Sequence, residues 1–235
     1  MKKFFIILAA FVGLNSAYAQ TPGDDNGFGV RVGFEFPADG YGFPEEAGSM
    51  FNGDMKMPST NVAFGLAIDS RWYVWNNDMF GVAINARWAD VSYGKGERNK
   101  ENALLDYEYE LSTVALDFCS PGLMFTYYPK DKMAVDVYYN FLPSMMFSVH
   151  DVDIESLGVN IDSENRYRAA GISHAFGAAF RYGILNAGLE YKVGNLGIYS
   201  SKMEDDYLYG SEYDWENDDY SLKANKFRIF VGMKF

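Results

Sequence analysis

The last ten residues of the chain alternate between two kinds of side chain. One parity is wholly apolar and the other is mixed: Phe227, Ile229, Val231, Met233 and Phe235 against Arg228, Phe230, Gly232 and Lys234. A β-strand places such alternating sets on opposite faces. In a soluble sandwich the apolar row would face a core, but here the chain also ends on Phe235 and the alternation recurs upstream beside polar rows. The pattern therefore predicts a membrane barrel whose apolar rows face lipid and whose polar rows face a small lumen.

Seven further segments alternate in the same way and bring the strand number to eight. We expect the strands at residues 27–36, 61–75, 79–93, 107–128, 133–149, 167–182, 186–199 and 226–235. Three connections are short, at 76–78, 129–132 and 183–185, and four are long, at 37–60, 94–106, 150–166 and 200–219. Outer-membrane barrels have short periplasmic turns and long external loops. The sequence thus predicts an all-β fold, an eight-stranded antiparallel up-and-down transmembrane β-barrel with both termini periplasmic.

The segment 107–128 is the least regular, because the parity of its apolar residues changes twice. The first change, between Leu111 and Val114, predicts a bulge or kink. The second, at Ser120-Pro121-Gly122, predicts another. The alternative at 120–122 is a hairpin, which would give an odd strand count or require one more strand. We favour the bulge, because single-chain bacterial barrels have even strand numbers.

Residues 1–19 have the pattern of a secretory signal peptide, with Lys2 and Lys3 before a short apolar run and a small-residue cleavage site at Ala17 and Ala19. We therefore expect a single barrel domain at 20–235. The run is too short to span a bilayer, and no later apolar run is long enough for a transmembrane helix. Without Lys2 and Lys3 the chain has 18 basic and 32 acidic residues, a net charge of −14. This charge argues against nucleic-acid binding through a basic surface.

Two segments and the last residue resemble a known family. The segments are Ser120-Pro-Gly-Leu-Met-Phe-Thr-Tyr-Tyr-Pro129 and Asn186-Ala-Gly-Leu-Glu-Tyr-Lys-Val-Gly-Asn-Leu-Gly197. They resemble the proline-led and glycine-aromatic-glycine strands of the Bacteroidetes-type outer-membrane β-barrel family, the porin-family or PorT-like small barrels. Phe235 is similar to the signal that the barrel-assembly machinery reads. The resemblance implies the barrel fold and location in the outer membrane of a Gram-negative bacterium. It implies no catalytic residue and no shared substrate.

The inward parity carries charges of both signs, which predicts a lumen filled by ion pairs. The residues expected in this plug are Arg31, Glu35, Asp69, Arg71, Arg87, Asp117, Asp136, Arg181, Glu190, Lys192 and Arg228, and the same parity argument adds Lys234, Glu108 and Glu110. These fourteen residues are seven cations and seven anions. An eight-stranded barrel is just wide enough for side chains to fill its interior. Buried charges must be paired, so we expect a plug. An open conducting pore is the alternative.

The excess negative charge is expected in the long connections. Their net charges are −3 for 37–60, zero for 94–106, −4 for 150–166 and −7 for 200–219. The last one also holds Tyr207, Tyr209, Tyr213 and Trp215. We expect an acidic, aromatic external crown. It is either a solvated surface or a recognition site for a glycan or protein partner. The spacing Asp151-Val-Asp153-Ile-Glu155 is not that of a calcium loop, so no metal or other cofactor is expected.

Catalysis has few candidates in this sequence. His150, beside Asp151 and Asp153, is expected to be an ordinary histidine at the outer rim, and a carboxylate–histidine pair there is the alternative. Ser173 and His174 are neighbours on a strand, so they point to opposite faces and cannot form a dyad. Cys119, the only cysteine, is expected to be a small buried residue. We therefore expect no enzyme.

The favoured hypothesis is a non-enzymatic structural or surface-recognition protein. A narrow porin-like channel is the first alternative, and a lipid-modifying barrel enzyme is the second. The expected partners are outer-membrane lipid and lipopolysaccharide, the barrel-assembly machinery and a surface ligand at 200–219, without nucleic acid.

Overall fold

The computed structural model describes residues 26–38, 60–102, 105–156, 159–204 and 212–235. The expected signal peptide and most of the expected loop 37–60 lie outside the described residues. Within the described ranges the chain forms nine strands: β1 (Gly27–Pro37), β2 (Ala63–Asn76), β3 (Phe80–Asn102), β4 (Leu105–Lys130), β5 (Met133–Ser156), β6 (Val159–Tyr182), β7 (Leu185–Glu204), β8 (Glu212–Lys223) and β9 (Lys226–Lys234). Those ranges contain no helix long and apolar enough to cross a membrane.

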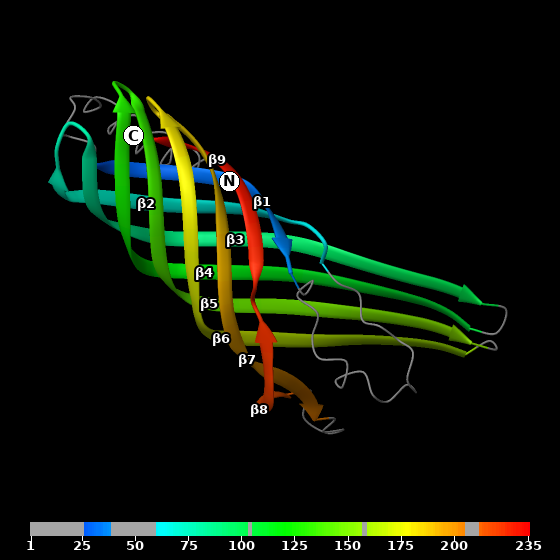
Figure 1. Cartoon of the computed structure of the whole chain (residues 1–235). Coiled ribbons are helices and arrows are strands. Elements are labelled where there is room, and N and C mark those ends of the chain that lie inside the picture. The colour runs from blue at the N-terminus through cyan, green and yellow to red at the C-terminus, as the bar shows by residue number, and fades with distance from the viewer. Residues whose placement is uncertain (1–25, 39–59, 103–104, 157–158, 205–211) are drawn as a thin grey trace, which may run out of the picture.

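The strands close into an antiparallel ring with eight positions (Figure 1). β1 to β7 follow one another around the wall, and β9 fills the space between β7 and β1. β8 and β9 share one position, because β9 pairs with the first part of β7 and β8 with the last part. The predicted eight-stranded antiparallel barrel is therefore confirmed. Within the described ranges, β1 to β7 and β9 each pair with a neighbour on both sides, as a strand in lipid requires, whereas β8 pairs with β7 alone.

Three tight turns lie at one end of the ring, together with Gly27 and Phe235; we call it the turn end. At the first turn, the Asn77 side-chain oxygen accepts hydrogen bonds from the backbone N–H groups of Met79 and Phe80, both at 2.8 Å. The other two turns use left-handed residues, Lys132 with φ of 66° and Gly183 with φ of 59°. All three fall at the predicted short connections, because asparagine and glycine adopt turn conformations at low cost.

The outer face of the ring is an apolar belt. The odd row of β9 predicted from the sequence is there, with Phe227, Ile229, Val231 and Met233 all exposed, and similar rows run along the other strands. Aromatic rings pack within the belt, as Phe34 does against Phe64 on the adjacent strand. So large a continuous apolar surface is not found on monomeric soluble proteins. It is the surface of a protein whose solvent is lipid.

β4 is one strand, and the hairpin alternative at 120–122 is wrong. Its pairing with β5 shifts register between Asp117 and Gly122, and Cys119 lies there with φ of 47°. This confirms the predicted bulge, although Cys119 is exposed and not buried. The predicted first bulge is wrong, because β4 keeps one register with β3 from 105 to 118 and Leu111 is fully buried inside. Because Leu111 is apolar but faces inward, the apolar alternation in the sequence looks as if its parity had changed.

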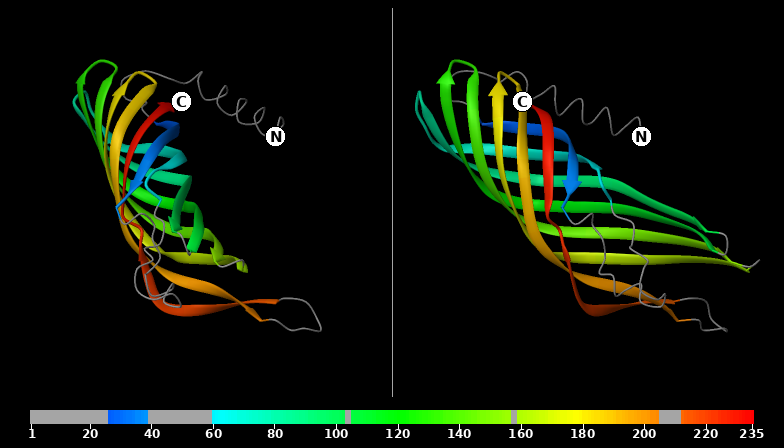
Figure 2. Two further views of the ribbon diagram at one scale, coloured as in Figure 1. Left: turned by 90° about the vertical axis from the view of Figure 1, so that its right-hand side faces the viewer. Right: turned by 45° about the vertical axis from the view of Figure 1, so that its right-hand side comes forward.

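Three long connections predicted as loops are largely strands. Residues 95–102 of β3, 105–112 of β4, 149–156 of β5 and 159–166 of β6 pair in unbroken register and form what we call the projecting sheet (Figure 2). Residues 199–204 and 212–217 likewise pair as the top of the β7–β8 hairpin. Polarity suggested loops, but the backbone still needs hydrogen bonds beyond the membrane. Alternating Val152, Ile154, Val159 and Ile161 favour strands. We call this end the hairpin end.

Candidate functional site

The lumen is the place where the sequence concentrates its polar side chains. Strand periodicity turns one parity of every wall strand inward, and the inner surface holds buried arginine, lysine, aspartate and glutamate. All eleven residues named for the plug lie on this inner surface and each takes part in an ion pair. Asp69 is the most exposed of them, with 13% of its side chain accessible.

Glu190 of β7 is the centre of the largest cluster. Its carboxylate accepts two hydrogen bonds from the Arg87 guanidinium, one at 3.0 Å and one shorter, and a third at 2.8 Å from the Tyr138 hydroxyl. Arg87 also donates to Asp90 at 3.0 Å. The bidentate geometry is the strongest that an arginine and a carboxylate can adopt. It joins β3 directly to β7 across the lumen.

Arg228 of β9 extends this cluster toward the hairpin end. It holds Asp90 with two hydrogen bonds of 2.6 Å and also donates to Glu35 of β1. The second oxygen of Glu35 accepts a 2.7 Å hydrogen bond from the Lys226 ammonium. Each of these side chains is nearly inaccessible to solvent, at 3% or less. A charge removed from water in this way must be matched by partners, and here every carboxylate has at least two.

A second cluster closes the lumen near the turn end. Asp136 of β5 accepts hydrogen bonds from Arg71 at 3.2 Å and from Arg181 at 2.7 and 3.2 Å. Thr126 donates to the same carboxylate at 2.7 Å. Two guanidinium groups thus share one carboxylate, so this part of the lumen carries an excess of positive charge.

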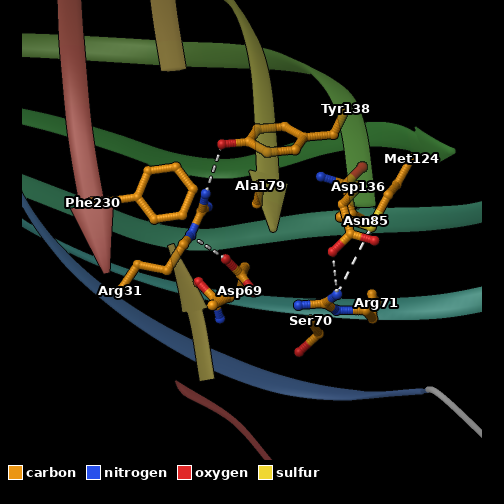
Figure 3. Close-up of a pocket in the computed structure, with 11 residues that line it drawn as sticks. Arg31, Asp69, Ser70, Arg71, Asn85, Met124, Asp136, Tyr138, Ala179 and Phe230 are labelled. Carbon is orange, nitrogen blue, oxygen red and sulfur yellow. Dashed lines mark hydrogen bonds and ion pairs between the residues drawn. The ribbon is translucent and has the colours of Figure 1, made fainter. Parts of the chain in front are cut away.

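Arg31 lies between the two clusters (Figure 3). It forms a 2.6 Å ion pair with Asp69, donates to the Tyr138 hydroxyl at 3.0 Å, and lies 4.9 Å from the centroid of the Phe230 ring. Gly177 of β6 makes room for the Tyr138 ring, since a Cβ there would overlap it. A cavity of about 20 Å³ is lined by Arg31, Arg71, Asn85 and Asn186 among others. A volume of that size accommodates about one water molecule.

On the wall formed by β4 to β7, Lys192 pairs with Asp117 at 2.6 Å, and Ser144 donates to the same carboxylate at 2.6 Å. Immediately toward the hairpin end the lumen changes character. Its filling there is an apolar layer of buried side chains from six strands: Ala63, Ala115, Met146, Ala169, Leu196, Ile198, Leu222 and Ala224. The charged clusters are thus followed, toward the hairpin end, by apolar packing.

The structure corrects the predicted charge balance of the lumen. Glu108 and Glu110 lie on the outer face, because Leu111 is inward, and Glu110 pairs there with exposed Lys95. Sequence reasoning missed Asp90 and Lys226, both buried in the lumen. Asp90 turns inward because the pairing of β2 with β3 slips by one residue at Trp88. Among the described residues the lumen therefore holds eight cations and six anions, and it is not neutral.

His150 does not lie exposed at the rim as predicted. It faces inward, only 1% exposed, with its ring centroid 4.8 Å from that of Tyr167. Asp151 is exposed on the opposite face of the strand, which argues against the alternative of a carboxylate–histidine pair between these neighbours. Burial lowers the pKa of His150 to about 4. On the outer face, His174 accepts or donates a 2.8 Å hydrogen bond with the Tyr139 hydroxyl, while Ser173 is buried inside.

The remaining predicted sites fall partly outside the description. Tyr207 and Tyr209 lie outside the described residues, whereas Tyr213 and Trp215 belong to β8 and pair in register with Met203 and Ser201. Phe235 exchanges two backbone hydrogen bonds with Phe28, at 3.0 and 2.7 Å, and so helps to close the ring. In the part of the chain that is described, no group of three or more histidine, cysteine or acidic residues is arranged to hold a metal ion.

Comparison with known proteins adds little to this geometry. No protein-family model matches the chain, and no curated protein matches its sequence. Among solved structures, Ail of Yersinia pestis in complex with the heparin analogue sucrose octasulfate is similar at 12% identity and a TM-score of 0.40, over 90% of this chain and 99% of Ail. The outer membrane protease OmpT of Escherichia coli is similar at 9% identity and 0.42, over 93% and 99%.

Neisserial surface protein A is similar at 14% identity and a TM-score of 0.26, over 88% of this chain and 97% of that one. Likenesses this loose carry no argument about binding or activity, and the assignment depends on the geometry of the chain itself. A closed antiparallel ring, an apolar outer belt and an ion-paired lumen make this chain a β-barrel protein of the outer-membrane type.

Proposed function

We propose that this protein is a non-conducting, non-enzymatic barrel in the outer membrane of a Gram-negative bacterium, which acts at the cell surface through its hairpin end. The turn end and both chain termini would be periplasmic, since short turns face the periplasm in such barrels. The family implied by the two barrel-strand segments, the Bacteroidetes-type small barrels, is part of the same proposal. Lipid and lipopolysaccharide would surround the apolar belt, and the assembly machinery would recognise Phe235.

The observation that carries the proposal is the filled lumen. To open a path for ions, the Glu190 cluster and the Asp136 cluster would both have to separate. Breaking one buried ion pair by removing a partner costs about 3–5 kcal/mol, and each cluster contains several. The apolar side chains beyond them, such as Met146, Leu196 and Leu222, would solvate an ion poorly. A role that depends on passage through the barrel is therefore energetically unfavourable.

What remains available for function is the hairpin end, where the strands continue well beyond the apolar belt. Among the β5 residues up to Asp151, whose exposure is described, the last large exposed apolar side chain is Phe147, yet the strand continues to Ser156. A strand needs only about 9–11 residues to cross a membrane, whereas β4 has 26. The excess length supports surface recognition, with the β7–β8 hairpin and its Tyr213 and Trp215 as one candidate contact for a glycan or protein.

The test is conductance in planar lipid bilayers, with insertion of the barrel verified separately by flotation with lipid vesicles. The inserted wild-type protein should pass no steady current. Arg87→Gln supplies the comparison for the channel alternative, because a conducting lumen would change its current when this cation is neutralised. Steady wild-type currents that respond to Arg87→Gln would overturn the proposal in favour of a narrow channel.

A further inference from the structure

The projecting sheet has two edges, because the strands that flank it in the barrel wall stop earlier. β2 leaves β3 at the pair of Ala63 with Gly94, while β3 continues to Asn102. On the other side, β7 leaves β6 at the pair of Tyr167 with Ser200, while β6 continues to Val159. Within the described ranges, no strand pairs with the outer side of 95–102 or of 159–166. Eight residues of β3 and eight of β6 therefore form open sheet edges, as Figure 1 makes visible.

An open edge presents a row of backbone N–H and C=O groups to another strand. Proteins usually protect such edges with lysine and other charges, and the β3 edge follows that rule with Lys95, Arg98 and Lys100. The β3 edge also holds Glu97 and Glu101 but is net basic, whereas the β6 edge is net acidic, with Asp162 and Glu164 against Arg166. The two edges of one sheet are thus chemically different.

The strand register places acidic residues of the neighbouring strands directly opposite those of the β6 edge. Glu97, Glu110, Asp151 and Glu164 occupy one level of four neighbouring strands, where Lys95 pairs with Glu110, and Glu108, Asp153 and Asp162 occupy another level. Like charges directly opposite one another in neighbouring strands destabilise a sheet. In each row the next register position is the open one beside β6. A positively charged residue in that position would relieve the repulsion of the whole row.

We propose that the β6 edge at 159–166 is a docking site for an extended, positively charged polypeptide segment that adds to the projecting sheet as an antiparallel strand. Backbone hydrogen bonds would supply most of the affinity, and lysine or arginine at every second residue would supply the specificity. A second copy of this chain fits less well, because on the face of these acidic rows its β3 edge has Glu97 and Glu101 as well as Lys95. The inference rests on the proposed function, since it places recognition at the hairpin end.

The test uses the full-length barrel in lipid nanodiscs and three fluorescent peptides. The probe is a Lys-Val tetrarepeat; the second peptide is the same sequence with alternate backbone nitrogens methylated, and the third is a Glu-Val tetrarepeat. Methylation keeps the charge but removes the donors that strand pairing needs. We expect binding of the probe, at least about tenfold weaker binding of the methylated peptide, and none of the acidic peptide. Equal binding of the first two would overturn the proposal in favour of charge attraction alone.

Matched variants separate the two edges. Asp162→Asn with Glu164→Gln should weaken the probe several-fold, whereas Glu97→Gln with Glu101→Gln on β3 should leave it unchanged. Probe binding should also protect the amides of 159–166, and not those of 95–102, from deuterium exchange. The opposite pattern, or an edge already protected by a second copy in the absence of peptide, would contradict the assignment. If the barrel binds none of the peptides and passes no current, only the docking proposal is refuted. If the barrel conducts ions, the proposed function is overturned.

Discussion

Replacing Glu190 with glutamine removes the carboxylate on which three guanidinium groups of the lumen converge. Arg87 holds it with two hydrogen bonds, and Arg31 and Arg228 lie 3.6 and 3.8 Å away. Glutamine keeps the shape and can still accept one hydrogen bond. It leaves Arg87 with Asp90 as its remaining anionic partner, and that carboxylate is already held by Arg228.

The expected loss is the cost of leaving a buried charge without its partner, about 3–5 kcal/mol in the free energy of unfolding. The Lys95–Glu110 pair on the outer face provides the matched control, because its side chains are 49% and 37% exposed. Glu110→Gln should therefore cost far less than Glu190→Gln, because solvent screens an exposed ion pair. Arg87→Met combined with Glu190→Met removes both charges and should recover most of the stability lost in Glu190→Gln, because an apolar replacement of a whole buried pair is often neutral.

Urea or guanidinium unfolding in lipid vesicles, followed by tryptophan fluorescence, measures all four proteins under identical conditions. The reasoning is refuted if Glu190→Gln and Glu110→Gln lower stability by the same small amount. It is also refuted if the double methionine variant is less stable than Glu190→Gln. In that case the attraction between Arg87 and Glu190 would outweigh the cost of burying the two charges.

Three further results follow from the packing. Gly177→Ala should destabilise the barrel by about 1–3 kcal/mol, because the added Cβ overlaps the Tyr138 ring, whereas Gly197→Ala, with its nearest neighbour at 3.8 Å, should be close to neutral in the same unfolding assay. Leu196→Ala opens the apolar layer and should cost about 2–5 kcal/mol; a loss under about 1 kcal/mol would mean that the layer is not packed. His150 lies beyond the belt, and its pKa falls from 6.5 to about 4 on burial. The unfolded segment therefore takes up the proton first as pH falls, so stability is lost from about pH 6.5 down to about pH 4, by about 3 kcal/mol in all. Amide exchange in the β5–β6 hairpin should show this loss, and His150→Phe should abolish it.

Strand identity and ring closure could be predicted because lipid imposes a strict rule on the sequence. A wall strand must be apolar at every second residue, so the strand at Phe227 to Phe235 and the others like it can be recognised in the sequence. The short turns could be predicted as well, because asparagine and glycine, here Asn77 and Gly183, favour turn conformations. The same reasoning named eleven lumen residues, all of which the structure places on the inner surface.

The misses arose where that rule is interrupted or ends. A one-residue slip at Trp88 turns Asp90 inward, and nothing in the local sequence marks the slip. Beyond the belt the outer face of a strand meets water and no longer lipid, so its residues become polar and the projecting sheet was taken for two loops. The position of His150 was predicted wrongly for the same reason, because its burial depends on the pairing of β5 with β6 beyond Phe147.

The central claim is that the apolar rows face lipid while the charged rows fill a closed interior. A nitroxide scan from 227 to 233 tests it directly, with one engineered cysteine at a time in a Cys119→Ser protein reconstituted in vesicles. Labels at Phe227, Ile229, Val231 and Met233 should relax strongly with oxygen, which dissolves in lipid, and weakly with a water-soluble nickel reagent. Labels at Arg228 and Phe230 should respond little to either reagent. If the odd positions were shielded from both reagents in a protein dispersed in water without detergent, the apolar rows would form a soluble core and the account would be wrong.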